Sequence, residues 1–321
     1  MLKKIVFLSV FALFISCNKI DPNPIGTLTL QQTRQQIDPS ETQQILFTLA
    51  ADSMKGRESK NGGYFKAAQF VKDYFKAHNI APFYSNYQDT LSTKGVKTYN
   101  VVGRIGTYDP QKKTILIGAH LDHVGIRGSE GDTIYNGAND NATGSTAVMQ
   151  LGKFLAQFDW DQNIILALFA DEEKGLRGAY HLAERMKEEN VALEYMINFE
   201  MIGKTLTTGP NKVYLTGYYE SDMADQLNQI SAGFVEFLPQ AKELNLFKRS
   251  DNFAFFQQME IPAHTLSSFD FKNYDYYHKA EDEAEKMDLE NMNQIIGTAA
   301  FTVAKLLHQK NKISLTSKFK Q

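Results

Sequence analysis

The sequence predicts an α/β fold in one domain, with a central sheet covered by helices on both faces. Apolar segments of strand length alternate with segments of helical periodicity, which is the pattern of an α/β sheet. The chain has 321 residues and is 43% hydrophobic, enough for one sizeable core. Acids and histidines follow directly after several of the apolar segments. We expect the folded domain to cover residues 36–312.

The periodicity places the main elements. Apolar residues spaced i, i+3, i+4 predict helices over 42–54, 64–75, 142–158 and 292–307. Short runs rich in β-branched and aromatic residues predict strands over 98–105, 114–117, 164–170, 195–199 and 213–216.

The N-terminus predicts export. Lys3 and Lys4 precede an apolar stretch over 5–15 that is too short for a mature transmembrane helix, and Cys17 follows it. The segment resembles a bacterial lipoprotein signal, with Cys17 as the lipidated first residue of the mature chain. An ordinary secretory signal is the alternative. A lipid anchor would hold the protein at a membrane of the cell envelope, on its periplasmic or surface face.

The flanking segments and the charge give two further expectations. Residues 18–35 are polar and contain Pro22 and Pro24, which predicts a flexible tether, and 313–321 predict a polar tail. The formal charge is −3 without a basic patch, so we expect no nucleic-acid partner.

Metal-binding side chains follow the predicted strands. In open α/β sheets, ligands bind beyond the carboxyl ends of the strands. Carboxylates and imidazoles without a thiolate are typical of hydrolytic zinc sites. Strand 114–117 leads to His120 and Asp122, strand 164–170 to Glu172 and Glu173, and strand 195–199 to Glu200.

Each candidate also has a simpler interpretation. We favour His120 as a ligand, with the Asp122 carboxylate accepting its second ring N–H, although the two could form a structural hydrogen-bonded pair. His123 competes as ligand, but alternation points it away from Asp122. Asp140, between two asparagines, could cap a helix or bridge two cations.

The adjacent acids suggest divided roles. We assign Glu173 to a metal and Glu172 to catalysis, since a base must stay off the metal; a solvated loop is the alternative. Glu200 ends an apolar strand, where a charge is costly unless paired. His278 could be an ordinary loop histidine, while the adjacent Tyr277 offers a phenol to a developing oxyanion.

Together these segments resemble the two-zinc aminopeptidase family of clan MH, which is similar to glutamate carboxypeptidase II and glutaminyl cyclase. The matching residues are Met54–Glu58, Gly118–Asp122, Asn136–Gly144, Asp171–Glu173, Asn198–Gly203, Ser250–Asn252 and Tyr277–His278. The resemblance implies a mixed, mostly parallel sheet and two zinc ions. It makes Asp140 the bridging ligand, with His120 and Glu200 on one zinc and Glu173 and His278 on the other.

The resemblance implies hydrolysis of peptides from their N-terminus, with Glu172 as general base and Tyr277 stabilising negative charge. Glu200 stands where the family usually has Asp, and Lys279-Ala280 replaces its usual Thr-Pro. Three alternatives stay open: a one-zinc glutaminyl cyclase, a carboxypeptidase that uses Lys248 and Arg249 to bind a terminal carboxylate, and a non-catalytic binding lipoprotein.

Overall fold

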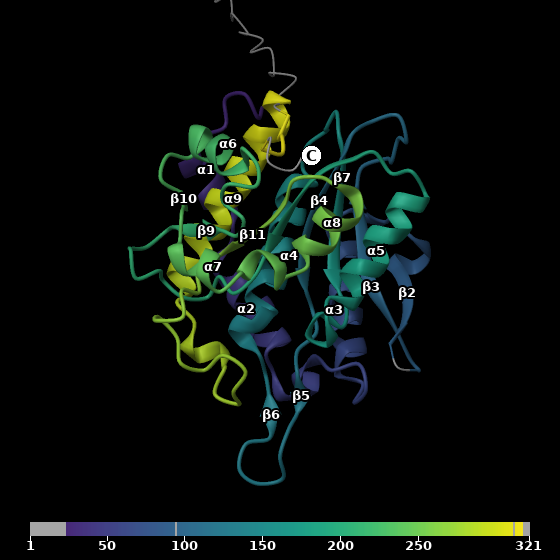
Figure 1. Ribbon diagram of the computed structural model, residues 1–321, viewed down its shortest axis with the longest axis vertical. Coiled ribbons are helices and arrows are strands. Elements are labelled where there is room, and N and C mark those ends of the chain that lie inside the picture. The colour runs from purple at the N-terminus through teal and green to yellow at the C-terminus, as the bar shows by residue number, and fades with distance from the viewer. Residues whose placement is uncertain (1–23, 94, 311, 317–321) are drawn as a thin grey trace, which may run out of the picture.

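The computed structural model describes residues 24–93, 95–310 and 312–316 (Figure 1). The α-helices are α1 (Leu30–Gln36), α2 (Pro39–Leu49), α3 (Gly63–Ala77), α4 (Thr143–Leu155), α5 (Arg177–Glu188), α6 (Met223–Ile230), α7 (Pro239–Glu243), α8 (Asn252–Met259) and α9 (Leu289–Gln309). Short helical segments include η1 (Asp52–Arg57), η3 (Ala138–Ala142) and η4 (Glu172–Lys174).

The strands form one large mixed sheet and a small hairpin of β5 (Gly125–Ile126) and β6 (Ile134–Tyr135). The large sheet has the order β1-β3-β7-β4-β8-β11-β9-β10, with β2 paired to β3. Its strands are β1 (Ile80–Pro82), β2 (Gln88–Thr93), β3 (Val96–Ile105), β4 (Thr114–His120), β7 (Asn163–Phe169), β8 (Leu193–Phe199), β9 (Val213–Leu215), β10 (Val235–Glu236) and β11 (Ala263–Ser267).

The parallel part of the sheet lies at its centre. Strands β7, β4, β8 and β11 pair in parallel, whereas β1, β2 and β3 form antiparallel pairs at one side. On the other side β9 pairs antiparallel to β11 and parallel to β10. The expected mixed sheet is therefore confirmed, with parallel pairing concentrated in its middle.

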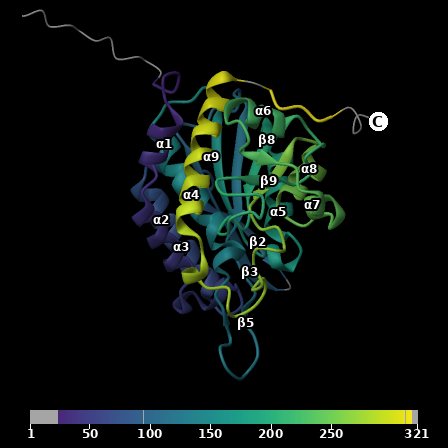
Figure 2. The same cartoon turned by 90° about the vertical axis from the view of Figure 1, so that its left-hand side faces the viewer.

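Helices cover both faces of the sheet, as predicted. Helices α2, α3, α4 and α9 lie on one face, and α5 and α8 lie on the other (Figure 2). The alternation along β4 divides its side chains between the two cores, since Ile115 and Ile117 belong to the first and Leu116 to the second. Fully buried central strands read as continuous apolar runs, which made them easy to predict.

The expected tether and tail are wrong over their described parts. Residues 30–36 form α1, which begins with a capping box of Thr29 and Gln32 and packs on α9. The Arg34 guanidinium donates to Thr298 Oγ1 on α9. At the other end Ile313 is buried, and Leu315 forms a β-bridge with Ser221. The folded domain therefore includes α1 and the segment around Ile313, which the polar composition of these regions did not predict.

Cys17 and the predicted signal segment lie outside the described residues. Within 24–93, 95–310 and 312–316, no helix combines the length and the apolar character needed to cross a bilayer.

Candidate metal centre

The candidate ligands come from loops at one edge of the sheet. Strand β4 ends at His120, and β7 and β8 end just before the segments that carry Glu173 and Glu200. Asp140 lies in η3, before α4, and His278 follows β11. Because β4, β7 and β8 run parallel, their carboxyl ends meet at the same edge.

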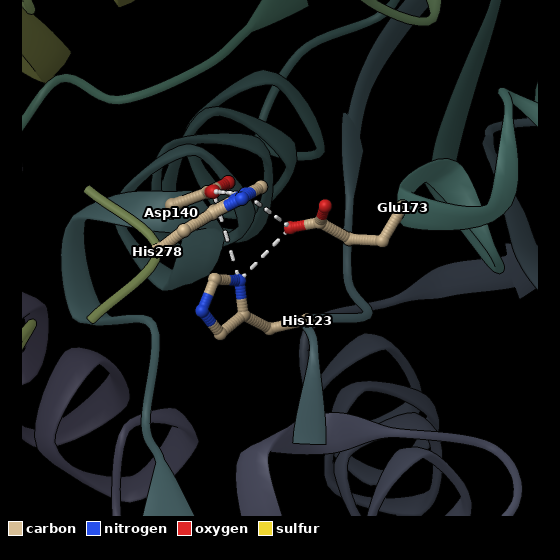
Figure 3. A group of neighbouring side chains, drawn as sticks. All are labelled: His123, Asp140, Glu173 and His278. Carbon is tan, nitrogen blue, oxygen red and sulfur yellow. Dashed lines mark hydrogen bonds and ion pairs between the residues drawn. The ribbon is translucent and has the colours of Figure 1, made fainter. Parts of the chain in front are cut away.

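One group of donors contains two histidines and two acids, and Figure 3 shows their nitrogen and oxygen atoms facing one another. The residues are His123, Asp140, Glu173 and His278. His278 Nε2 lies 3.0 Å from Asp140 Oδ2 and 3.1 Å from Glu173 Oε1. His123 Nδ1 lies 3.0 Å from the same Glu173 oxygen and 3.6 Å from Asp140 Oδ2.

A second group consists of His120, Asp140 and Glu200. His120 Nε2 lies 3.2 Å from Asp140 Oδ1, whereas the first group approaches Oδ2. The two oxygens of Asp140 thus face two different sets of donors, which is the arrangement of a carboxylate that bridges two cations. All five residues that the sequence selected as ligands are brought together.

His123, which the sequence argument named as a competing ligand and set aside, also belongs to a donor group. Its placement contradicts the expected alternation, because β4 ends at His120 and the following residues are not extended strand. Gly137 lets the 136–140 loop pack on the imidazole: its φ is 58°, and a Cβ there would lie 2.4 Å from ring atoms of His123. The proximity of His123 to His120 in the sequence was the available signal.

The loop that carries Asp140 is held by its neighbours. Asn141 Nδ2 donates to the Phe199 carbonyl, and its Oδ1 accepts from Met201 N–H, on either side of Glu200. The Asp282 carboxylate accepts from the backbone N–H of Asp140. Asp140 itself does not cap α4, so the bare capping interpretation is wrong. The asparagine contacts instead fix Asp140 relative to Glu200.

Arg57 holds the loop that follows β4 and the loop that carries Asp140. Its buried guanidinium donates to the carbonyls of Leu121, Leu49, Asn136, Gly137 and Asp140. Burial lowers the pKa of Arg57 to about 10, so that the side chain remains a cation at neutral pH. One side chain thereby satisfies backbone acceptors that would otherwise be buried without donors.

Asp122 has a different role from the one expected. His120 Nδ1 lies 3.1 Å from the Asp122 backbone carbonyl, but 3.9 Å from its Oδ1. The carboxylate instead accepts from the backbone N–H groups of Glu172 and Glu173, at 3.0 and 3.4 Å. The chain turns after β4, which brings the carbonyl to the imidazole and frees the carboxylate to position the two glutamates.

Glu172 belongs to neither donor group. Burial raises its pKa well above the ordinary range, against the opposing charge of His120, and the acids Glu200 and Asp251 add to the rise. A raised pKa suits a carboxyl group that must both accept and release a proton near neutral pH. Glu172 therefore lies outside the donor groups, and its role as the base stays a prediction.

The electrostatics of the centre favour cations. Burial would lower the pKa of both His120 and His278, yet the surrounding acids raise them, for His278 to about 10. Burial raises the pKa of Glu200 to about 7. Over the described residues, the ion pairs of Asp140 and Glu173 are with histidines, and none is with lysine or arginine. Positive charge from outside the chain would balance these acids.

Several buried nitrogen and oxygen atoms of the centre have no hydrogen-bond partner, which indicates that metal ions supply the positive charge. His120 Nε2, His123 Nδ1 and Glu200 Oε2 are buried and form no hydrogen bond. Buried polar atoms without partners are costly, and imidazole with carboxylate oxygen is a donor set that zinc accepts. The residues therefore fit two divalent cations that share Asp140.

A cavity opens beside the second donor group. Its lining includes Glu200, Tyr214, Arg249, Ser250, Phe269 and Tyr277. The ring of Tyr277 stacks on His278, with 4.0 Å between centroids. Burial and the acids of the centre raise the pKa of Tyr277, so the phenol keeps its proton. Tyr277 can therefore donate a hydrogen bond to a molecule in the cavity.

Solved structures with this fold are enzymes of more than one kind. LapA from Legionella pneumophila, an aminopeptidase, matches 87% of this chain and 76% of its own, with a TM-score of 0.67 at 20% identity. A glutaminyl cyclase from Fimbriiglobus ruber matches 84% of this chain and 95% of its own, with a TM-score of 0.65 at 16% identity. At these identities the likeness shows the fold alone.

Curated relatives match a shorter stretch. A probable zinc metalloprotease of Leptosphaeria maculans is 33% identical over 111 residues, which is 34% of this chain and 26% of the relative. An aminopeptidase of Pseudomonas aeruginosa is 34% identical over 111 residues, which is 19% of its length. The chain thus spans only about a fifth to a quarter of these relatives. Residues 100–303, more than half of the chain, match peptidase family M28, and the chain belongs to that family.

Proposed function

We propose that the protein is a zinc-dependent exopeptidase, an aminopeptidase that removes N-terminal residues from peptides with two zinc ions. The observation that carries the proposal is the bridging position of Asp140, whose Oδ1 lies 3.2 Å from His120 Nε2 and whose Oδ2 lies 3.0 Å from His278 Nε2. A binding protein would have no need for two cations beside an unligated acid.

The residues would divide the chemistry among them. Zinc, when bound, polarises the scissile carbonyl and lowers the pKa of water. Glu172 would take the proton of the attacking water and deliver it to the leaving amine. Tyr277 would donate its phenolic O–H to the oxygen that gains negative charge.

The names of relatives support peptide hydrolysis. The P. aeruginosa relative is an aminopeptidase, and the L. maculans relative is a probable zinc metalloprotease. The relevant test incubates the purified chain with aminoacyl and peptide substrates before and after chelation. We expect two zinc ions per chain, release of N-terminal residues, loss of activity with chelator and recovery on adding zinc. A chain that binds two zinc ions but cleaves no peptide contradicts the proposal.

A glutaminyl cyclase is the second candidate, because the F. ruber enzyme has a TM-score of 0.65, similar to that of the aminopeptidases. Peptides with N-terminal glutamine separate the two, since a cyclase forms pyroglutamate without shortening the peptide. One zinc per chain together with pyroglutamate formation would favour the cyclase.

A carboxypeptidase is the third candidate, because Arg249 lines the same cavity as Glu200 and Tyr277. A guanidinium there could bind the terminal carboxylate of a peptide. Lys248, the other cation considered, lines a different cavity with Phe247 and Phe253. Peptides with a blocked amino terminus and a free carboxyl terminus separate the candidates, because only a carboxypeptidase would cleave them.

We also propose that Cys17 is lipidated and anchors the protein in a bacterial cell envelope, on its periplasmic or surface face. Expression in a bacterium with a labelled fatty acid tests this. The wild type should carry label and partition with membranes, and Cys17→Ser should do neither. Equal labelling of both proteins contradicts the anchor.

A further inference from the structure

The two donor groups that share Asp140 are unequal. The group with Glu200 has three protein residues, whereas the group with Glu173 has four. Zinc in proteins is mostly four-coordinate. Three protein donors leave one position for a water or substrate atom, but four leave none. The number of protein donors therefore decides which of the two cations has a free position to bind the substrate.

The fourth member of the larger group is His123, and its imidazole is placed as a ligand would be. Nδ1 lies 3.0 Å from Glu173 Oε1 and 3.6 Å from Asp140 Oδ2, without forming a hydrogen bond to either. The side chain is 0% exposed, and Nε2 also has no hydrogen-bond partner. A buried imidazole with neither nitrogen bonded costs free energy, and a cation at Nδ1 would offset that cost.

Contacts around the ring keep it in place. Gly137 packs on the His123 ring, and the Gly137 carbonyl accepts from the Arg57 guanidinium. Arg57 also holds the Leu121 carbonyl, two residues before His123. Gly137 therefore limits the space beside the imidazole, and Figure 3 shows Nδ1 directed at Asp140 and Glu173.

We propose that His123 Nδ1 is a direct ligand of the zinc held by Asp140, Glu173 and His278, which closes that site with four protein donors. The inference rests on the proposed two-zinc function. It makes the pair asymmetric: the closed site is structural and electrostatic in role, and the site of His120, Asp140 and Glu200 receives the reacting molecule.

The surroundings of the smaller group agree with this assignment. Glu200 of the three-donor group lines the cavity beside the centre, whereas His123, Glu173 and His278 of the four-donor group do not. The cavity therefore lies beside a residue of the site with the open position.

X-ray absorption at the zinc edge of the wild-type, two-zinc protein tests the ligand directly and needs no variant. If His123 binds, the spectra contain three imidazoles for every two zinc ions, from His120, His123 and His278. If it does not, they contain two. If a protein that holds two zinc ions and cleaves peptides shows only two imidazole ligands, this inference is overturned. The proposed function is then unaffected.

A pair of variants gives a second readout. His123→Ala should weaken zinc binding at the four-donor site by at least about 10-fold, the smallest loss expected when a residue that only supports a ligand is removed. His120→Ala is the matched control, since it removes a donor from the three-donor site and should weaken the other zinc. Competition with a chromophoric chelator measures both affinities, and circular dichroism checks folding. Unchanged zinc affinities in folded His123→Ala overturn the inference, while fewer than two zinc ions in the wild type overturn both proposals.

Discussion

The carboxylate of Asp122 accepts a hydrogen bond from the backbone N–H of Glu172, with 3.0 Å between Oδ1 and N. Its second oxygen lies 3.4 Å from the backbone N of Glu173. A single buried side chain on one loop therefore sets the position of both the proposed base and a ligand on another loop. The contact links the end of β4 to the segment after β7.

Asp122→Asn tests this positioning role. Asparagine offers one acceptor in place of two and turns an amide N–H₂ toward a backbone donor, so one of the two glutamates should shift. We expect kcat to fall by about 10- to 100-fold, the range seen for residues that orient a ligand. Zinc affinity should also fall, through Glu173. Steady-state kinetics and zinc competition measure the two effects, and unchanged values for both would refute the role.

Glu172→Gln should stop turnover and leave the metals bound. The amide is nearly the same size but cannot accept the proton, and general base catalysis accounts for about 10²- to 10⁴-fold in rate. Zinc content should equal that of the wild type, because Glu172 is in neither donor group. Glu188→Gln, at an exposed position on α5, is the control and should leave kcat unchanged. Near-normal rates in Glu172→Gln would show that the base is another group.

Arg57→Ala should destabilise the fold as well as the metal centre. The substitution leaves several buried carbonyls without their donor, and each such group costs about 1–3 kcal/mol. We expect the free energy of unfolding to fall by more than about 3 kcal/mol, measured by urea denaturation in the presence of chelator so that zinc does not contribute.

Arg127→Ala is the matched control for Arg57, because Arg127 forms a partly exposed ion pair with Glu58 at 3.5 Å. Such pairs contribute less than about 1 kcal/mol. Equal losses in the two variants would mean that the buried guanidinium has no special role.

His264 should make stability depend on pH. Burial lowers the pKa of His264 to about 4; Nδ1 donates to the Thr216 carbonyl and Nε2 accepts from Ser221 Oγ. Between pH 6.5 and 4 the unfolded chain binds a proton at this histidine that the folded chain does not. This contribution to stability is complete above pH 6.5, and about 3 kcal/mol of it is lost as the pH falls to 4.

Comparison of the wild type with His264→Gln isolates that contribution. Urea denaturation at pH 7, 5.5 and 4.5 with chelator present should show the wild type losing more stability than the variant as the pH falls. Parallel pH profiles would indicate that His264 is protonated equally in both states.

Much of the fold followed from local patterns. The central strands β4, β7 and β8 are buried on both faces, so their apolar runs were visible in the sequence. Strand β11 contains the polar residues His264, Thr265 and Ser267, whose partners come from distant segments, and it was not predicted. Helix α1 was hidden for a similar reason, since polar residues such as Arg34 bond to α9.

In the candidate centre, too, one part could be predicted from local patterns and another part depended on contacts between distant segments. The sequence by itself determined the chemistry, because His120, Glu173 and Glu200 each come after an apolar strand, and parallel strands bring such positions to one edge. Only the tertiary structure decided how many donors face each side of Asp140. That number depends on the direction of the chain after β4 ends. This direction places His123 in the centre and points the Asp122 carboxylate at the backbone of Glu172 instead of at His120. Local alternation ends with the strand, and beyond it direction is set by contacts between segments far apart in the sequence.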